Sequence, residues 1–253
     1  MSTVKPISVK ILAVAVAGLA LLFVIAWAVT SRNGSGPSRS DDPLGDADMT
    51  PGPESQVQAA PRSIPRSLQM LTVAEPHLGP PAYDRSLWQH WVDEDRDCQD
   101  TRQEVLIVEA RGAVTFASGA MCRVIAGVWF DEYTGATLTN PGDLDVDHLV
   151  PLKNAHISGG WSWSAEQRRA YANDLAHADQ LIGVSASANR AKGDQGPTTW
   201  KPPRTEYWCE YAVSWIAVKN HWTLTITVAE QEALLSMLAA CPPGRSEGGE
   251  AGR

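Results

Sequence analysis

The sequence predicts an α+β fold, with short strands and helices in separate stretches rather than in strict alternation. Aromatic and apolar residues recur at helical spacing over residues 207–222, which predicts a helix with a buried face. Residues 143–150 and 180–185 are short, apolar-rich stretches bounded by turn residues, which predicts two strands. Nine of the ten tryptophans lie between Trp88 and Trp222, so this region has enough apolar mass for a core.

Three helix starts carry a capping box, in which an N-cap side chain and a Gln or Glu three residues later bond each other's backbone N–H groups. The boxes are Asp100–Gln103, Ser164–Gln167 and Thr227–Glu230. They predict helices over residues 101–110 and 165–176 and a last helix that ends at Leu238.

The strands have equally recognisable ends. A hairpin is expected over residues 122–139, with its turn at residues 133–135. The strand over residues 143–150 should end at Pro151, because proline cannot donate to a strand ladder. The second strand leads directly into "ASANRAKG", a helix that Gly193 stops.

We expect four parts along the chain. Residues 1–30 would form an N-terminal membrane anchor or signal peptide. Residues 31–80 are rich in Pro, Ser, Gly and Asp and lack an apolar period, so they would form a disordered linker. The folded domain would cover residues 81–243, and residues 244–253 would form a disordered tail.

The N-terminal hydrophobic segment favours export. Residues 11–29 contain only apolar residues and glycine, and as a helix they would span about 28 Å, close to the hydrocarbon thickness of a bilayer. Lys5 and Lys10 precede them, which favours a cytoplasmic N-terminus and a translocated remainder. "AWA" at 26–28 also fits a signal-peptide cleavage site, but the run exceeds the about 7 to 15 residues of a typical h-region. We favour an uncleaved anchor with the domain outside, and cleavage would give a secreted protein.

All four cysteines, Cys98, Cys122, Cys209 and Cys241, lie in the predicted domain. An even number in an exported chain favours two disulfides. Of the three possible pairings we favour Cys98–Cys122 and Cys209–Cys241, since each encloses one compact segment. A four-cysteine zinc site is the alternative, but the chain contains no CxxC pair.

The net charge of −8 argues against a strongly basic nucleic-acid binder. Residues 81–243 hold 13 basic and 21 acidic residues, so the excess of acid lies in the predicted domain. A site that handles phosphate must therefore be local, or must contain a metal ion that offsets the negative charge.

The stretch "DLDVDHLVPLKNAH", residues 143–156, is the strongest candidate for chemistry. Taken alone, its alternating aspartates fit the exposed edge of a sheet, the commoner meaning of so short a pattern. Hydrolysis of a phosphodiester, however, needs a base for the attacking water and a cation for the developing negative charge. A histidine beside a carboxylate supplies both if another hard ligand joins them, and "LIGVSASANRAKGD", residues 181–194, offers one.

Together these motifs resemble the HNH endonucleases of the ββα-metal superfamily, including the HNH domain of RNA-guided CRISPR effectors. "DVDHLVP" and "NRAKGD" carry this resemblance. With "DTRQEVL", "TTWKPP" and "WCEYAVSWIAVK", the chain resembles an HNH family related to the C-terminal domain of the GmrSD restriction enzyme, over residues 84–241. The resemblance implies a ββα-metal core within a disulfide-braced domain, endonuclease activity and, as in many members, export.

The resemblance also implies roles for single residues. His148 would be the general base, and Asp147 and Asn189 would hold a divalent cation, in the first place Mg²⁺, with Mn²⁺ or another divalent ion as alternatives. Lys192 would join the catalytic residues through a phosphate contact. Asp147 and His148 point to opposite faces of a regular strand, so both can serve one site only where the strand ends and twists.

Further phosphate contacts could come from Arg190, Arg102 and His156. A solvated helix face explains Arg190 equally well, pairing within its own helix explains Arg102, and a structural loop role explains His156. Asn173 is the nearest candidate for the middle Asn of the family's motif, but it does not directly precede the second strand.

The expected partner is nucleic acid, with DNA favoured over RNA and little sequence preference, because the chain carries no separate recognition module. RNA remains an alternative substrate, since no sequence feature indicates how the protein would distinguish a 2′-hydroxyl group.

A non-catalytic, disulfide-braced extracellular binding module is the alternative from another functional class. Asp93, Asp95, Asp97 and Glu104 stand at positions 1, 3, 5 and 12 of an EF-hand-like calcium loop. Cys98 stands at position 6, where that loop needs glycine for its turn, which argues against calcium binding.

Overall fold

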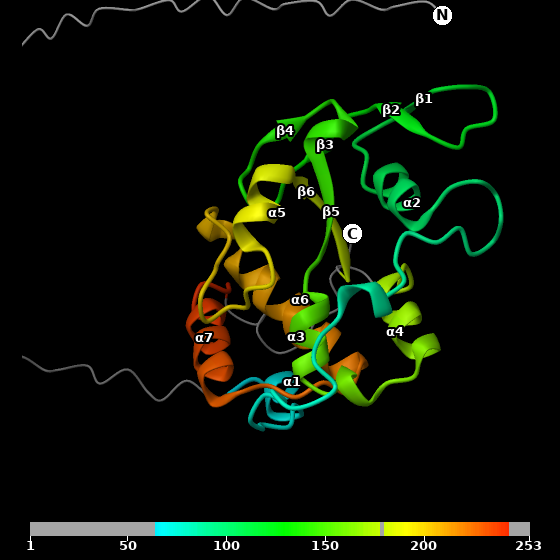
Figure 1. Ribbon diagram of the computed structural model, residues 1–253. Helices are drawn as coiled ribbons and strands as arrows, with labels where there is room; N and C mark the ends of the chain where they lie inside the picture. The colour runs from blue at the N-terminus through cyan, green and yellow to red at the C-terminus, as the bar shows by residue number, and fades with distance from the viewer. Residues whose placement is uncertain (1–63, 178–179, 243–253) are drawn as a thin grey trace, which may run out of the picture. The chain divides into compact units, whose positions relative to one another are not determined.

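The computed structural model describes residues 64–177 and 180–242, and these form the mixed α+β fold that the sequence predicts (Figure 1). The strands are β1 (Thr115–Phe116), β2 (Val124–Ala126), β3 (Trp129–Phe130), β4 (Thr137–Leu138), β5 (Leu144–His148) and β6 (Leu181–Ser185). The α-helices are α1 (Arg66–Gln69), α2 (Thr101–Val108), α3 (Leu152–Ile157), α4 (Ala165–Ala172), α5 (Ala186–Lys192), α6 (Trp208–His221) and α7 (Val228–Leu238). Short 3₁₀ helices are η1 (Arg85–Leu87), η2 (Pro141–Asp143), η3 (Gly160–Ser162) and η4 (Thr205–Tyr207).

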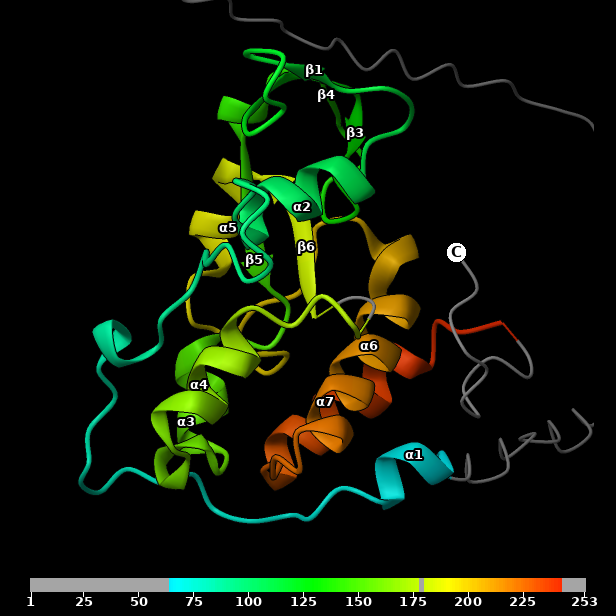
Figure 2. The same cartoon turned by 90° about the vertical axis from the view of Figure 1, so that its right-hand side faces the viewer.

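The strands pair into three two-stranded antiparallel sheets, β1–β2, β3–β4 and β5–β6. Figures 1 and 2 show β1 to β4 at one end of this part of the chain and α3, α4, α6 and α7 at the other, with β5 and β6 running between them. The β5–β6 pair therefore connects two groups of elements, and its residues are buried from both sides.

β5, β6 and α5 form a compact strand–strand–helix unit. Leu144 pairs with Ser185 and His148 with Leu181, and nearly every residue of both strands is buried. α5 begins directly after β6 with Ser185 as its N-cap, and it packs on both strands. It ends at Gly193, whose φ of 55° is the left-handed conformation that glycine adopts most readily. Both predicted strands and the helix that follows them are confirmed.

The hairpin expected over residues 122–139 is correct only for its second part. β3 and β4 pair across a turn that contains Gly135 at a φ of 80°. β2 pairs with β1 instead of joining this hairpin. Trp129 is buried and donates its Nε1–H to the carbonyl of Leu106 at 2.7 Å, which holds the β3–β4 hairpin against α2.

Helix starts follow the capping signals. Ser164 and Gln167 form a complete capping box at the start of α4. Asp100 and Thr227 cap α2 and α7, but the glutamine and glutamate three residues later bind elsewhere in the fold. The three helices therefore begin where predicted. In α2 and α7 the third residue of the box, Gln103 or Glu230, makes a tertiary contact instead of completing the box.

The main core is aromatic and lies among α3, α4, α6 and α7. Trp88, Tyr171, Tyr211 and Trp215 are at most 1% exposed, and their rings contact one another or adjacent aromatic rings edge-on or tilted. Such arrangements add to the stabilisation from buried area, by about 0.5 to 1.5 kcal/mol per pair. α6 lies within the predicted helix over residues 207–222 and presents this aromatic face to the core.

The folded part begins before the expected boundary at residue 81. Leu68 of α1 and Leu71 are buried in the main core, and α1 packs against α6. Val73 forms a parallel bridge with Ile226, and Asn220 donates its side-chain amide to the carbonyl of Ser67 at 2.8 Å. Residues 64–74 therefore belong to the folded unit rather than to the linker.

Both predicted disulfides are confirmed, as Cys98–Cys122 and Cys209–Cys241. The first joins the loop before α2 to the segment before β2, and the second joins α6 to the chain after α7. The expected anchor over residues 11–29 lies outside the described residues. Within residues 64–177 and 180–242, no helix combines the length and the apolar character needed to cross a bilayer.

Candidate active site

A cleft of about 400 Å³ opens beside the end of β5, between the start of α3, α5 and the segment around η1. Its lining includes Asp147, His148, Asn189 and Arg190 from the two sequence motifs, together with Tyr83, Arg85 and Lys153. Because β5 ends at His148, the chain turns there towards Pro151, and neighbouring residues of opposite strand faces can border the same cleft. The fold thus brings both motifs together around one cavity.

His148 is held as a neutral imidazole with a defined tautomer. Its Nε2 lies 2.9 Å from the carbonyl oxygen of Ala172. A carbonyl can only accept a hydrogen bond, so Nε2 carries the proton and Nδ1 keeps its basic lone pair. Burial lowers the pKa of His148 to about 3, against the opposing effect of the Ala172 contact. The ring also lies nearly parallel to that of Trp91, with 5.5 Å between centroids, so its orientation is fixed.

Asn173 fixes the surroundings of His148 rather than joining the cleft. Its Oδ1 accepts the N–H of Val92 and the hydroxyl of Thr101, at 3.1 and 2.9 Å. Its Nδ2 donates to the carbonyls of Gln89 and Arg169, both at 2.8 Å. Asn173 therefore ties the loop that carries Trp91 to the end of α4, next to the carbonyl that His148 contacts.

Asp147 is buried, accepts two hydrogen bonds and forms an ion pair with Lys192. Lys192 Nζ lies 3.0 Å from Oδ1 and 2.7 Å from Oδ2, and the Tyr133 hydroxyl donates to Oδ2 at 2.7 Å. Lys192 also donates to the carbonyl of His148 at 3.0 Å and is fully buried. Burial raises the pKa of Asp147 and lowers that of Lys192, while the contact between the two charges opposes both shifts.

The oxygen atoms of Asp147 and Asn189 fit a hard divalent cation. An ionised carboxylate has about four acceptor sites, and the two hydrogen bonds and the ion pair with Lys192 and Tyr133 occupy at most three of those at Asp147. The Asn189 amide donates Nδ2–H to Asp145 Oδ2 at 3.1 Å, which leaves its carbonyl oxygen as a ligand. Since both residues line the cleft, a cation held there would keep positions open for water and phosphate oxygens.

Three of the predicted phosphate contacts lie outside the lining of the cleft. Lys192 is buried beneath Asp147, as described above. Arg102 donates its Nη2 to the carbonyls of Pro141 and Leu144, at 2.9 and 3.1 Å, and so holds the start of β5. His156 is buried, with its Nε2 3.0 Å from the carbonyl of Pro81. Of the predicted phosphate contacts, only Arg190 borders the cleft.

Comparison with known proteins agrees with this arrangement of motifs. The family of GmrSD restriction endonucleases, C-terminal domain, matches residues 101–237, more than half of the chain. The chain belongs to this family. An "Uncharacterized secreted protein" of Arthroderma benhamiae (strain ATCC MYA-4681 / CBS 112371) is 42% identical over 179 residues, which cover 71% of this chain and 85% of that protein. No solved structure matches the chain.

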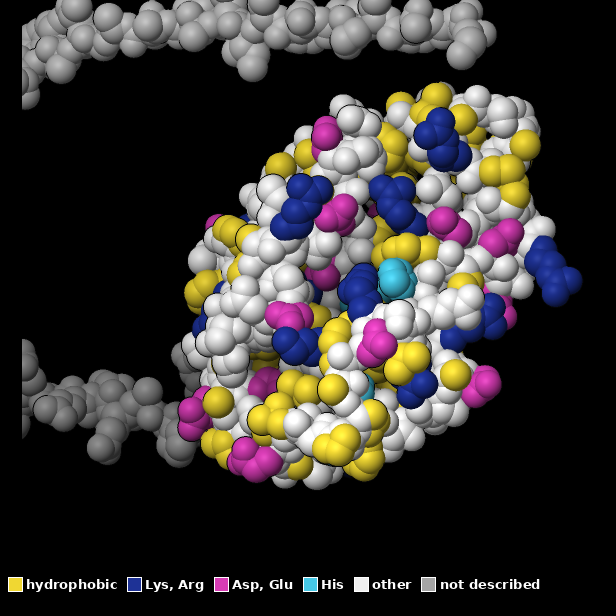
Figure 3. All heavy atoms as spheres, in the orientation of Figure 1, with side chains coloured by type: hydrophobic (Ala, Val, Ile, Leu, Met, Phe, Trp, Pro, Cys, Tyr) yellow, Lys and Arg dark blue, Asp and Glu magenta, His cyan; other side chains and the backbone are white. Residues whose placement is uncertain are grey.

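This GmrSD C-terminal domain has a basic rim that sequence reasoning missed. Arg85 and Lys153 line the cleft with Arg190. Arg85 lies outside the motifs, and Lys153, within residues 143–156, pairs with Asp194, which also lines the cleft. Figure 3 shows dark blue side chains in the middle of the face on which α3, α5 and η1 meet in Figure 1, with acidic side chains between them. Three cationic side chains therefore border the cleft beside the carboxylates of Asp147 and Asp194, although the net charge of the chain is −8.

Tyr133 is a second residue that no motif indicates. The sequence predicts it only as part of a turn, yet it is fully buried and donates to Asp147. Asp131, also buried, accepts the N–H of Tyr133 and the hydroxyl of Thr134, which fixes the turn. A tyrosine in an otherwise polar turn is the one sequence signal that could have indicated that Tyr133 is buried and contacts Asp147.

The acidic loop meets the requirements of an EF-hand only in part. Asp93, Asp95 and Asp97 bring one carboxylate oxygen each within 4.8 Å of one another. Glu104 lies in α2 and is not part of that group, and Asp93 Oδ2 already accepts the N–H of Cys98 at 3.0 Å. The loop therefore brings together three of the four carboxylates that the EF-hand pattern requires.

The low pKa of His148 predicts acid sensitivity. The unfolded chain binds a proton at this histidine below about pH 6.5, whereas the folded domain does not bind it until about pH 3. Stability from this group is thus complete above pH 6.5 and is lost as the pH falls towards 3. At one pKa unit per about 1.4 kcal/mol, the loss at pH 4 is about 3 kcal/mol.

Urea unfolding at pH 7 and pH 4 measures this effect. His148→Gln removes the titrating group and retains an amide donor for Ala172, so its free energy of unfolding should fall less between the two pH values than that of the wild type. Equal losses in the two proteins would contradict a buried neutral His148.

Proposed function

We propose that the chain is a metal-dependent endonuclease that hydrolyses phosphodiester bonds of DNA. One observation supports this most directly: His148 is neutral, its basic Nδ1 is free of the Ala172 contact, and it borders a cleft with the hard oxygens of Asp147 and Asn189. The family match to restriction endonucleases makes a nuclease the class of enzyme to test. The Mg²⁺ ion is the first candidate for the cation.

In this proposal His148 is the general base. Its Nδ1 takes a proton from a water molecule while the water oxygen attacks phosphorus, and the bond from phosphorus to the leaving oxygen breaks. The Nε2–H contact with Ala172 holds the ring in the required tautomer and supports the positive charge that the ring acquires. A low pKa makes His148 a weak base in the free protein, and we expect the phosphate and the attacking water to improve its proton affinity once bound.

Asp147 and Asn189 would hold the cation, which supplies charge stabilisation for the phosphate oxygens and the leaving group. Lys192 already offsets the negative charge of Asp147. We therefore expect weak cation binding without nucleic acid and tighter binding once phosphate oxygens complete the ligand set. The strand–strand–helix unit of β5, β6 and α5 supports the further proposal that this is a ββα-metal core.

The basic rim of Arg85, Lys153 and Arg190 would hold phosphates on either side of the scissile bond. These contacts carry no base specificity, so we propose cleavage with little sequence preference. The word "secreted" in the name of the Arthroderma relative supports export of this chain as well. We propose that the domain acts outside the membrane, tethered by residues 11–29 or released after cleavage.

Plasmid DNA and a structured RNA, each incubated with the purified protein, test the proposal. We expect cleavage of the DNA with Mg²⁺, complete loss of cleavage with EDTA, and recovery when excess Mg²⁺ is restored. Asn189→Ala should raise the Mg²⁺ concentration for half-maximal rate by about tenfold or more. Ser187→Ala, on the exposed side of the same helix, should leave it unchanged. Cleavage in EDTA, or none on either substrate with Mg²⁺ or Mn²⁺, would overturn the proposal.

A further inference from the structure

Two histidines and an aspartate meet at a place away from the cleft. Asp174 and His177 follow α4, and His221 is the last residue of α6. Each offers one ligand atom, a carboxylate oxygen or a ring nitrogen, and the three atoms lie within 4.8 Å of one another. The centroids of the two imidazole rings are 3.4 Å apart. None of the three residues lines the candidate active site.

Asp174 is fixed by its own turn. One carboxylate oxygen, Oδ1, accepts the backbone N–H groups of Ala176 and His177, at 3.0 and 3.3 Å. The other, Oδ2, lies 2.8 Å from Nδ1 of His177. The side chain of Asp174 is only 8% exposed. The carboxylate is thus held in place before any ion binds, with Oδ2 directed to the histidine pair.

His177 and His221 remain accessible to an ion from solvent. The side chain of His177 is 41% exposed, and His221 is also exposed. His221 lies at the C-terminal end of a 14-residue helix, where unpaired carbonyl groups create a partial negative charge. The partial negative charge at this helix end favours binding of a cation beside His221.

Two imidazoles and one carboxylate are the donor set of a borderline metal ion such as Zn²⁺. A tetrahedral zinc with bonds of about 2.0 to 2.1 Å needs its ligand atoms roughly 3.3 Å apart. Atoms that already lie within 4.8 Å reach this spacing through small side-chain rotations. The candidate active site offers a different donor set, the hard oxygens of Asp147 and Asn189, which suit Mg²⁺ better than Zn²⁺.

We propose that Asp174, His177 and His221 form a zinc site that links the end of α6 to the segment between α4 and β6. Three protein ligands leave the fourth position of the ion to water. The site joins residues that are 44 positions apart in the sequence, so the bound ion acts as a cross-link. It lies next to Asn173 and Ala172, which orient His148, and it therefore braces the support of the candidate active site without touching the cleft.

Zinc titration of the EDTA-treated, dialysed full chain against a fluorescent zinc chelator tests this proposal. We expect one equivalent bound with a dissociation constant in the micromolar range or below. His221→Ala and His177→Ala should each weaken it by about 100-fold or more. His77→Ala removes a half-buried histidine that stacks on Trp161 elsewhere, and it should not change the affinity. Asn189→Ala should not change it either, which separates this site from the cleft.

Thermal unfolding gives a second measurement. A zinc concentration of 100 times the dissociation constant should raise the Tm of the wild type by about 5 to 10 °C, and that of His221→Ala much less. Zinc binding weaker than about 100 µM, or a tight equivalent that His221→Ala and His177→Ala leave unchanged, would overturn the proposal. Its outcome is independent of nuclease activity, because neither measurement uses a substrate.

Discussion

Replacing His148 with alanine is expected to lower the rate of DNA cleavage by about 100- to 10,000-fold, the range for loss of a general base. In the proposed mechanism His148 is the general base: it is buried and neutral, and its Nε2–H contact with Ala172 would leave Nδ1 for the attacking water. Water attack without a base remains possible but slow. Initial rates on supercoiled plasmid DNA with Mg²⁺ measure the effect.

His156→Ala is the matched control. Both histidines are 5% exposed and each contacts a backbone carbonyl through Nε2, but His156 lies outside the lining of the cleft. The two variants should lose similar free energy of unfolding, since each removes a buried ring and one hydrogen bond. Only His148→Ala should lose cleavage. Similar rates in the two variants would remove His148 from the role of base.

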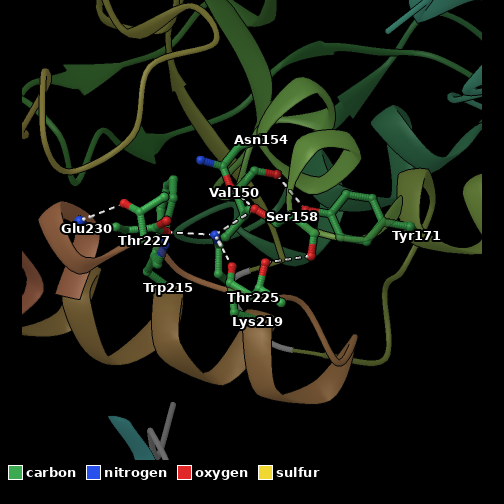
Figure 4. A network of polar contacts seen from close by, with 9 residues as sticks. All are labelled: Val150, Asn154, Ser158, Tyr171, Trp215, Lys219, Thr225, Thr227 and Glu230. Atoms are coloured by element: carbon green, nitrogen blue, oxygen red, sulfur yellow. Dashed lines mark hydrogen bonds and ion pairs between the residues drawn. The ribbon is translucent and has the colours of Figure 1, made fainter. Parts of the chain in front are cut away.

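Replacing Lys219 with methionine is expected to lower the free energy of unfolding by about 3 to 5 kcal/mol. Lys219 is fully buried, and its Nζ lies 2.7 Å from Glu230 Oε1, 3.0 Å from the Ser158 hydroxyl and 2.9 Å from the Thr225 carbonyl (Figure 4). Trp215 donates to the same Glu230 oxygen at 2.5 Å. Methionine fills the space but leaves the Glu230 carboxylate buried without its counter-charge.

Removing both charges separates the loss of the Lys219 contacts from the penalty of leaving the Glu230 carboxylate buried and unpaired. Lys219→Met with Glu230→Gln replaces the carboxylate by an amide whose oxygen still accepts the Trp215 N–H. The double variant should recover most of the loss, because the penalty of the single variant comes from an unpaired buried charge. Urea unfolding of the wild type, both single variants and the double variant measures the coupling. A double variant no more stable than Lys219→Met would contradict this account.

Much of the fold could be predicted because its elements are specified locally. Ser164 and Gln167 define a helix start within four residues, and Gly193 ends α5 through its own backbone conformation. Such features need no knowledge of distant residues, so sequence patterns identify them. The observed disulfides are the pairing favoured among the three possible ones, in which each bridge encloses one segment of the chain.

The surroundings of the site could be predicted only in part, because they depend on contacts between distant segments. His148 and Asn189 belong to motifs, but Tyr133 reaches Asp147 only through the packing of the β3–β4 hairpin. Arg85 borders the cleft because η1 lies beside β5, which no local pattern indicates. Residues 64–74 likewise belong to the folded unit because Leu68 packs in the main core, a contact with residues far away in the sequence.

Lys192 shows how a motif position can mislead. Its place beside Asn189 and Arg190 suggests a phosphate contact, but its side chain extends into the interior and neutralises Asp147. The sequence pattern predicts a lysine on this face of the helix. It does not show whether the side chain reaches solvent and a phosphate or, as here, the buried carboxylate of Asp147. Arg102 is similar, since two backbone carbonyls take its donors.

The two disulfides have a consequence for the cell that makes this protein. Cys209–Cys241 joins α6 to the end of α7, and Cys98–Cys122 holds the loop before α2. In a reducing cytosol these thiols stay unpaired, and loss of a native disulfide typically costs a small exported domain about 2 to 5 kcal/mol. The proposed nuclease would therefore be least stable in the reducing compartments of the cell and would reach its full stability only after export. Oxidative folding would in this way tie the stability of the domain to its export.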